Sequence, residues 1–204
     1  EQRRQQQRYE EIFHGANDVI TIHDPETGEY RDVNETLCEM TGYDRDEIIE
    51  MGIDGVSATD DGYTASRAKS FIETVVESGQ PDTTEWKIET ADGDYRWLEV
   101  NGSVASINGE PRYLSLARDI TEQKRREREY EQIFNGVNDA IAIFDPETFS
   151  FVDVNESYHE LVGYDDLERI RELGIGGLSA TEDGYTAERG KGLIQTVART
   201  GEPQ

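Results

Sequence analysis

The sequence contains one long stretch twice, and this internal repeat constrains the fold more than any other feature. The first copy begins YEEIFHGANDVITIHDPETGEYRDVNETLCEMTGYD at Tyr9, and the second begins YEQIFNGVNDAIAIFDPETFSFVDVNESYHELVGYD at Tyr130. The copies are 121 residues apart at their start, and one insertion near Leu173 lengthens the offset by one residue. A period of about 120 residues is the length of a domain, so the chain duplicates a whole fold and is not a solenoid.

The two copies differ in length. Residues 82–121 continue the first copy, whereas the chain reaches Gln204 where the same continuation of the second copy is due. The chain also begins with Glu1 rather than Met, and we interpret it as a piece of a larger protein. The predicted organisation is an entering helix at 1–8, a complete domain at 9–121, a helical linker at 122–129 and the N-terminal part of a second domain at 130–204.

Hydrophobic periodicity predicts strands at both ends of the first copy and helices between them. Apolar and polar residues alternate in the manner of half-buried strands over residues 18–23, 30–33, 84–90, 95–107 and 113–117. Apolar residues at helical spacing predict helices over residues 34–40, 44–51 and 65–76. This order is typical of an α+β domain with one antiparallel sheet and helices on one of its faces. A second copy without the last three strands leaves a sheet edge unpaired, and we expect it to fold only marginally or with a partner.

Capping residues indicate where the predicted helices begin and end. Asn34 is a good N-cap for the first helix, and Gly42 is a good C-cap for it. The N-cap of the long helix is expected at Thr59, Asp60 or Asp61.

Several short motifs, in this order and at domain spacing, resemble PAS sensor domains. The front half carries the Asn-capped helix that ends in Gly42-Tyr43 and is followed by an acidic turn. The back half carries DGDYRW at 92–97, then Asn108-Gly109, and finally RDITEQK at 118–124. The resemblance covers nearly all of residues 9–122 and the shorter copy at 130–204.

This resemblance implies a fold and a class of function. It implies a five-stranded antiparallel sheet with helices over one face and a small pocket, present as a complete copy and a truncated one. It also implies a sensory or relay module that passes a conformational change through its exit helix to an effector domain of the same polypeptide, such as a histidine kinase. Asp119 and Thr121, in the closing motif, are the expected relay residues.

The same resemblance argues against two cofactors. Flavin-binding members that form a thiol adduct carry a cysteine after the Gly-Tyr pair, whereas Cys38 precedes it and Ala117 stands where those members place a glutamine. Haem-binding members use a histidine on the long helix, and residues 65–76 contain none. His14, His23 and His159 lie elsewhere and are expected to be solvated or in turns.

A small organic ligand remains possible on these grounds, as does a packed core without a pocket. Strand alternation and the apolar face of the long helix give one candidate set of inward-facing residues for such a pocket, namely Ile20, Ile22, Phe71, Val75, Trp86, Ile88, Leu98, Val100, Ser115 and Ala117. The alternative function is a ligand-free module that forms a homodimer through its entering helices.

The remaining motifs do not support catalysis or a metal site. The glycine-rich run at 174–177 follows no clear strand and lacks the Lys-Ser/Thr ending of a phosphate-binding loop. Neither a nucleophile with its base nor a paired metal-ligand motif is present in the sequence. We therefore expect no enzymatic activity and no metal in this chain.

The charge balance limits the partners and the environment. The chain has 45 acidic and 20 basic residues, for a formal net charge of −25. Such a surface repels nucleic-acid phosphates and anionic lipids, so we expect neither nucleic acid nor a membrane as a direct partner. The acidic residues are spread over the whole chain, which favours a halophilic, archaeal protein over a disordered tail. With Cys38 as the only cysteine and no apolar run of about 20 residues, we expect a cytoplasmic location.

Overall fold

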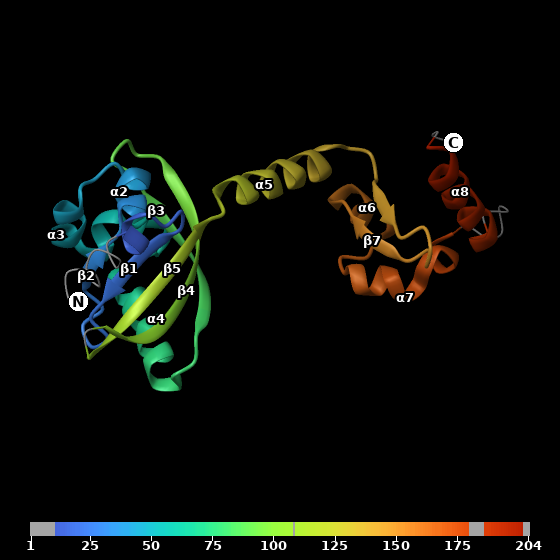
Figure 1. Ribbon diagram of the computed structural model, residues 1–204. Helices are drawn as coiled ribbons and strands as arrows, with labels where there is room; N and C mark the ends of the chain where they lie inside the picture. Colours follow the sequence, from blue (N-terminus) through green and yellow to red (C-terminus); the bar gives the residue numbers. More distant parts are fainter. Residues whose placement is uncertain (1–10, 108, 180–185, 202–204) are drawn as a thin grey trace. The chain divides into compact units, whose positions relative to one another are not determined.

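The computed structural model describes residues 11–107, 109–179 and 186–201, and the chain divides into two compact units, 1–125 and 126–204 (Figure 1). The predicted entering helix at 1–8, Asn108 of the predicted hairpin turn and residues 180–185 of the second copy lie outside the described residues.

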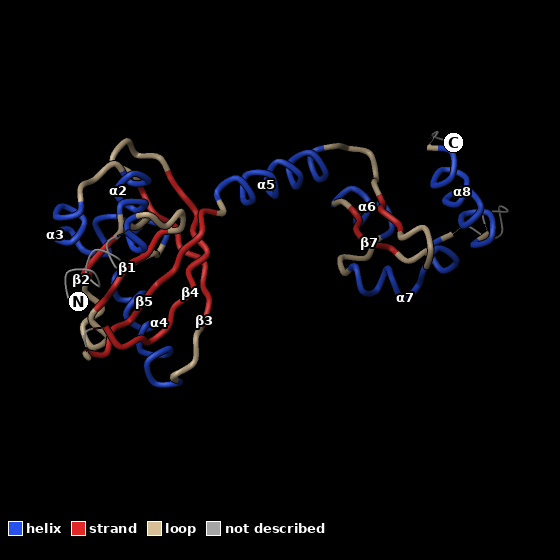
Figure 2. The backbone as a smooth tube through the Cα atoms, in the orientation of Figure 1, coloured by secondary structure: helices blue, strands red, loops and turns tan. Residues whose placement is uncertain are grey.

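The first unit contains the expected five-stranded antiparallel sheet. Its strands are β1 (Val19–His23), β2 (Tyr30–Val33), β3 (Asp82–Glu89), β4 (Tyr95–Ile107) and β5 (Glu110–Asp119). The order across the sheet is β2-β1-β5-β4-β3, so the first strand of the unit pairs with its last strand in the middle of the sheet (Figure 2). The long β4–β5 pairing, from Leu98↔Asp119 to Ile107↔Glu110, forms the largest part of the ladder.

The segments between β2 and β3 are helical and lie over one face of this sheet (Figure 1). They are α2 (Glu35–Thr41), α3 (Arg45–Val56), the 3-10 turn η1 (Thr59–Asp61) and α4 (Ala65–Ser78). Gly52, at φ 68°, is non-helical and interrupts α3 directly after residue 51, where the sequence predicted the end of the helix, and a short second helical segment follows it. A glycine adopts this left-handed conformation without the steric cost that a side chain imposes.

Two capping predictions are confirmed and one is wrong. The Asn34 side chain accepts a hydrogen bond from the Leu37 N–H, and Gly42 ends α2 in the left-handed conformation. The N-cap of α4 is Thr64, whose hydroxyl accepts from the Arg67 N–H, and not Thr59, Asp60 or Asp61. Those three residues form η1 instead.

Asn34 joins the first strand to the first helix. Its Nδ2 donates to the Asp18 carbonyl at 2.9 Å, while its Oδ1 accepts from the N–H groups of Ile20 at 3.0 Å and Leu37 at 3.4 Å. The side chain is fully buried. Asn155 makes the matching bonds in the second unit, to Asp139, Ile141 and Tyr158.

The second unit repeats the front half of the first. Helix α5 (Thr121–Gly136) leads into a hairpin of β6 (Ala142–Phe144) and β7 (Phe151–Val154), followed by α6 (Glu156–Val162), α7 (Leu167–Leu178) and α8 (Ala187–Thr200). The described residues of this unit form a two-stranded sheet. Val197 on α8 is 40% exposed, whereas its counterpart Val75 on α4 is fully buried beside Tyr113 of β5. Tyr113 belongs to the back half of the sheet, and the described residues of the second unit include no counterpart of it that could cover Val197.

We predict that Asn34→Ala lowers the free energy of unfolding by about 3 kcal/mol, because it removes an N-cap and breaks two further partly buried hydrogen bonds, with the Asp18 carbonyl and the Ile20 N–H. Urea unfolding of the 204-residue chain measures this loss. Asn101→Ala is the matched control, because Asn101 is exposed and makes one side-chain hydrogen bond, to Thr83. Equal losses in the two variants would contradict the structural role of Asn34.

Candidate functional site

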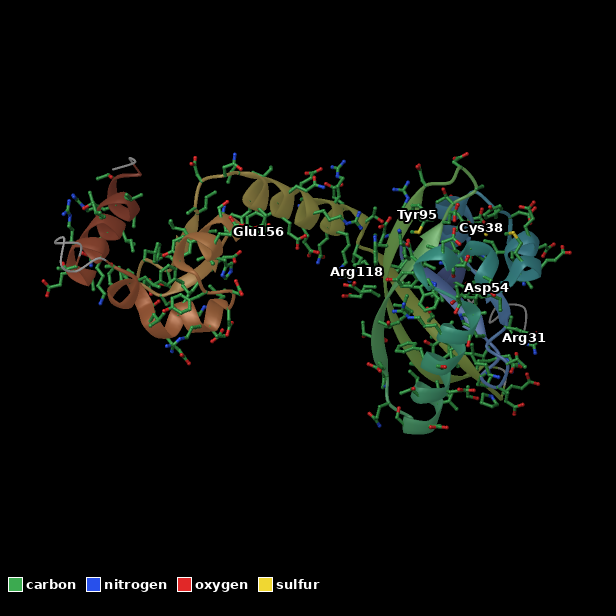
Figure 3. The ribbon with its side chains drawn as sticks, turned by 180° about the vertical axis from the view of Figure 1, so that it is seen from behind. Arg31, Cys38, Asp54, Tyr95, Arg118 and Glu156 are labelled. Carbon is green, nitrogen blue, oxygen red and sulfur yellow. The ribbon has the colours of Figure 1, made fainter. Side chains whose placement is uncertain are left out.

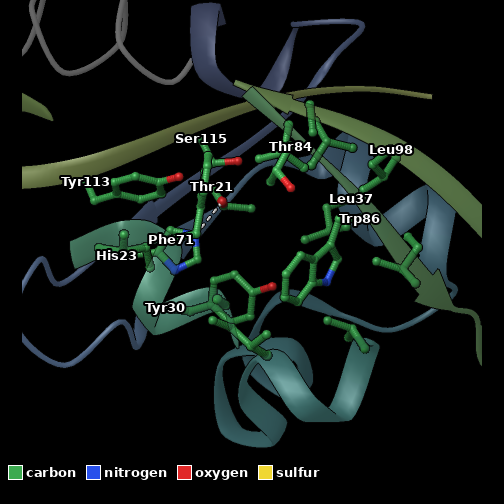
Figure 4. A pocket seen from close by; sticks show the side chains of 18 residues that line it. Thr21, His23, Tyr30, Leu37, Phe71, Thr84, Trp86, Leu98, Tyr113 and Ser115 are labelled. Atoms are coloured by element: carbon green, nitrogen blue, oxygen red, sulfur yellow. Dashed lines mark hydrogen bonds between the residues drawn. The ribbon is translucent and has the colours of Figure 1, made fainter. Parts of the chain in front are cut away.

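The first unit contains a cavity of about 70 Å³ between the inner face of its sheet and helices α2, α3 and α4 (Figure 4). Most of the predicted pocket residues line it, namely Phe71, Trp86, Ile88, Leu98, Val100, Ser115 and Ala117. These side chains come from α4 and from the three strands β3, β4 and β5, which the topology places side by side. The cavity therefore lies where the helical layer meets the middle of the sheet.

The prediction that Ile20 and Ile22 face this cavity is wrong. Val19, Thr21 and His23 of β1 line it, and successive side chains of a strand point to opposite faces. Ile20 and Ile22 therefore lie on the outer face of the sheet. Val75 is fully buried, but it packs with Ile72 and Tyr113 and does not line the cavity.

His23 is a cavity residue that the sequence interpretation placed in solvent or a turn. It is 5% exposed, and burial lowers its pKa from 6.5 to about 4, so the ring is neutral at pH 7. Its Nδ1 lies 3.0 Å from the Gly28 carbonyl, which only accepts, so Nδ1 carries the proton. Nε2 then accepts from the Thr21 hydroxyl at 2.7 Å.

Two tyrosines surround His23 and complete the polar end of the cavity. The ring of Tyr30 lies 4.7 Å from the imidazole and that of Tyr113 lies 5.5 Å from it, centroid to centroid. Burial raises the pKa of Tyr113, so its hydroxyl stays protonated. Sequence reasoning missed these tyrosines and Thr84, which also lines the cavity. For His23 the sequence did contain a signal, because Thr21 and His23 alternate with Ile20 and Ile22 and must therefore share one face of β1.

Trp86 forms the wall at the other end of the cavity. Its indole N–H donates to the Ser57 hydroxyl at 2.9 Å, and Ser57 also makes a β-bridge with Ile88. The Ala58 N–H donates to the Lys87 carbonyl, so the loop after α3 is fixed to the edge strand β3. This arrangement holds the indole in place.

The predicted relay residues lie where β5 passes into α5. Asp119 accepts from the Thr121 N–H at 2.8 Å, and the Thr121 hydroxyl accepts from the backbone N–H of Trp97 at 2.8 Å. The Ile120 N–H in turn donates to the Trp97 carbonyl at 2.8 Å. The first turn of α5 is thus bonded directly to β4.

Aromatic contacts connect the cavity wall to the start of α5. The Tyr63 ring lies 5.4 Å from Trp86 and 5.7 Å from Trp97, edge to face in both cases. The ammonium group of Lys124 lies 5.5 Å from the Trp97 ring and 2.8 Å from the Glu85 carboxylate. A continuous set of contacts therefore runs from Trp86 through Tyr63 and Trp97 to Lys124.

The cavity does not fit a flavin or a haem. At about 70 Å³ it is well below the range of about 300–1,000 Å³ typical of cofactor and drug-sized sites, because Phe71, Trp86 and Tyr113 occupy the interior. Cys38 is half-buried on α2 and does not line the cavity. Within the described residues, no group of three or more His, Cys, Asp or Glu side chains is arranged to hold a metal ion.

Charged side chains project from the surfaces of both units, as Arg31, Asp54 and Glu156 illustrate (Figure 3). By contrast, none of the described residues that line the cavity is an Asp, Glu, Lys or Arg. Among the helices in the described part of the chain, none is both long and apolar enough to span a bilayer.

Comparison with known proteins identifies the family. A family model described as a PAS domain matches residues 17–122, which is half of the chain, and a second PAS domain model matches residues 128–197. The chain belongs to the PAS domain family, and it carries two such domains in tandem. Sensory signalling is the role that the family and its sensor relative support.

The methyl sulfide methyltransferase-associated sensor of Methanosarcina acetivorans is 28% identical over 120 residues. The match covers 59% of this chain but only 12% of that protein, so the chain spans about an eighth of its relative.

Two solved structures illustrate the similarity to single PAS domains. The PAS domain of an HTR-like protein from Haloarcula marismortui is 24% identical, with a TM-score of 0.49 over 58% of this chain and 99% of that one. A domain of a sensory box sensor histidine kinase/response regulator from Geobacter sulfurreducens is 29% identical, with a TM-score of 0.46 over 58% and 97% of the two chains.

We predict that His23 makes the fold acid-sensitive. Its pKa is about 4 in the folded chain and 6.5 when unfolded, so its contribution is complete above pH 6.5 and is lost as the pH falls towards 4. The loss amounts to about 3 kcal/mol of the free energy of unfolding. Urea unfolding between pH 7 and 4 measures it, and His23→Asn should remove this part of the pH dependence. His14→Asn, at an exposed site, is the control, and an unchanged profile for His23→Asn would contradict the assignment.

Proposed function

We propose that this chain is the sensory input and relay segment of a signal-transduction protein, with no reaction of its own. In this proposal the first unit binds a small ligand in its cavity. Binding shifts the population between two arrangements of the unit, and α5 passes the difference to an effector domain of the same polypeptide, such as a histidine kinase of a two-component system.

The observation that carries the proposal is the path from the cavity wall to the exit helix. Trp86 touches both the cavity and Tyr63, and Tyr63 touches Trp97. Trp97 is bonded through its backbone to Ile120 and Thr121, at the start of α5. A ligand that displaces the Trp86 indole therefore has a short packed route to the helix that leaves the unit. Asp119 and Thr121 act in this proposal by fixing the helix to the sheet.

The proposed setting is the cytoplasm of a halophilic archaeon. The net charge of −25 on a patterned, folded chain supports it, since dispersed carboxylates keep a protein hydrated in concentrated salt. The same charge supports the proposal that neither nucleic acid nor a membrane is a direct partner.

The relay is tested by breaking α5 beside the sheet. Lys124→Pro removes the hydrogen bond from the Lys124 N–H to the Ile120 carbonyl and disrupts the helix there, at a cost of about 3 kcal/mol to that helix. In a fusion of residues 1–204 to a histidine-kinase core, we expect this variant to lose regulation of autophosphorylation. Hydrogen exchange should show both units still folded.

Lys124→Ala is the matched control, because it keeps the helical backbone and removes the side-chain contacts of Lys124, which include those with Glu85 and Trp97. Unchanged regulation in the proline variant would defeat the relay. Thr121→Val, which removes the acceptor for the Trp97 N–H, should weaken regulation without breaking the helix.

A second candidate function is a ligand-free module that forms a homodimer through its entering helices. Ile12, in the helical segment 11–14, is 63% exposed, which favours a partner surface at this end of the chain. Sedimentation of the chain over a range of concentrations tests it. A dimer that is lost on deleting residues 1–8 and in Ile12→Glu supports this function, and a monomer at all concentrations excludes it.

A further inference from the structure

The strongest unexplained feature of the cavity is a pair of buried hydroxyl groups without protein partners. Tyr113 is 2% exposed and Ser115 is 6% exposed, and both line the cavity. Among the described residues, every fully enclosed polar side-chain atom has a hydrogen-bond partner, whereas neither of these two hydroxyls has one. Both must therefore keep open surface, and the cavity is the space beside them (Figure 4).

Hydroxyls with open surface inside a cavity remain available to hydrogen-bond whatever occupies it, and a guest that bonded neither of them would leave polar groups unsatisfied at a cost in free energy. His23 is not their hydrogen-bond partner, since its two nitrogens are engaged by Gly28 and Thr21. The hydroxyl of Tyr30 reaches the same cavity from β2. A guest with one oxygen or nitrogen atom would meet hydroxyls from two sides.

The rest of the lining limits the charge of the guest. Within the described part of the chain, the lining contains no Asp, Glu, Lys or Arg, and His23 is neutral at pH 7. An ion entering the cavity would lose its hydration and find no opposite charge in the lining, and the nearest carboxylate that acts on the lining, Asp82, lies outside it and raises the pKa of Tyr113 less than burial does. Apolar walls from Phe71, Ile72 and Val100 instead favour a guest with a hydrocarbon part.

The volume of the cavity limits the size of the guest. A cavity of about 150 Å³ holds benzene, which has six heavy atoms, so about 70 Å³ corresponds to about three heavy atoms, or a few more if the lining adjusts.

We propose that the first unit binds an uncharged amphiphilic molecule of about three to five heavy atoms, such as a short-chain alcohol or ketone, through the hydroxyls of Tyr113 and Ser115. This inference rests on the proposed function and names the chemistry of its ligand. Water alone is the competing occupant.

The test is a titration of the 204-residue chain with 1-propanol, followed by ¹H–¹⁵N NMR. We expect saturable shifts at the amides of Thr21, Tyr113 and Ser115. For four heavy atoms the Kd is about 40 µM at the tightest. Propionate and propylammonium, which have the same chain length and carry a charge, should bind at least tenfold more weakly, and 1-hexanol should not bind more tightly than 1-propanol.

Tyr113→Phe and Ser115→Ala should each weaken 1-propanol binding about fivefold, the effect of one neutral hydrogen bond. Because neither hydroxyl bonds to the protein, both variants should remain folded, which urea unfolding checks. Ser103→Ala, on the outer face of β4, and Tyr164→Phe, in the second unit, are the matched controls and should bind as the wild type does.

Three results would overturn the proposal: no saturable shift up to about 100 mM, equal binding of the charged analogues, or unchanged affinity in both hydroxyl variants. The first result means that the cavity holds water only. These outcomes are separate from the relay test. If 1-propanol binds but Lys124→Pro keeps its regulation, the ligand chemistry holds and the relay is wrong. If 1-propanol does not bind but Lys124→Pro loses its regulation, the relay holds and only the proposed ligand class is wrong.

Discussion

One buried asparagine at the end of the first hairpin determines how each unit is assembled. Asn34 makes hydrogen bonds both to the strand, at Ile20, and to the first turn of α2, at Leu37. Asn155 makes the same two kinds of hydrogen bond in the second unit. A buried carboxamide must satisfy both its donors and its acceptor, so this side chain fixes the angle at which the helix leaves the strand. Leu37, placed in this way, is one wall of the cavity.

The cavity itself depends on small residues at neighbouring positions of the two central strands. Gly102 on β4 is paired with Ser115 on β5, and Ala117 follows on the same face. A Cβ at Gly102 would collide with the hydroxyl of Tyr113, so only glycine allows this ring to lie across β4. The ring of Tyr113 thus occupies the space above Gly102, and the small side chains of Ser115 and Ala117 leave the neighbouring space open as the cavity.

The fold could be predicted largely from the sequence because its signals are local. The strand at 30–33 and the caps at Asn34 and Gly42 depend on neighbours within a few residues. The inner face of β1 could not be predicted, because Val19, Ile20 and Ile22 place apolar side chains on both faces of that strand. Which face is covered by helices depends on residues far along the chain. Likewise several good N-caps stand in one short segment before α4, and only the packing of that loop selects Thr64.

The chain combines a highly charged exterior with an interior site that has no fixed charge. Surface carboxylates respond to ionic strength, since screening shortens from about 8 Å at 0.15 M salt to about 3 Å at 1 M. Hydroxyl groups and a neutral imidazole do not respond in this way. If the cavity binds an uncharged guest as proposed, its lining offers no fixed charge to be screened, and the same occupancy at a given ligand activity is expected in dilute and in saturated brine. Such a detector would report the chemistry of its surroundings without also reporting their salinity.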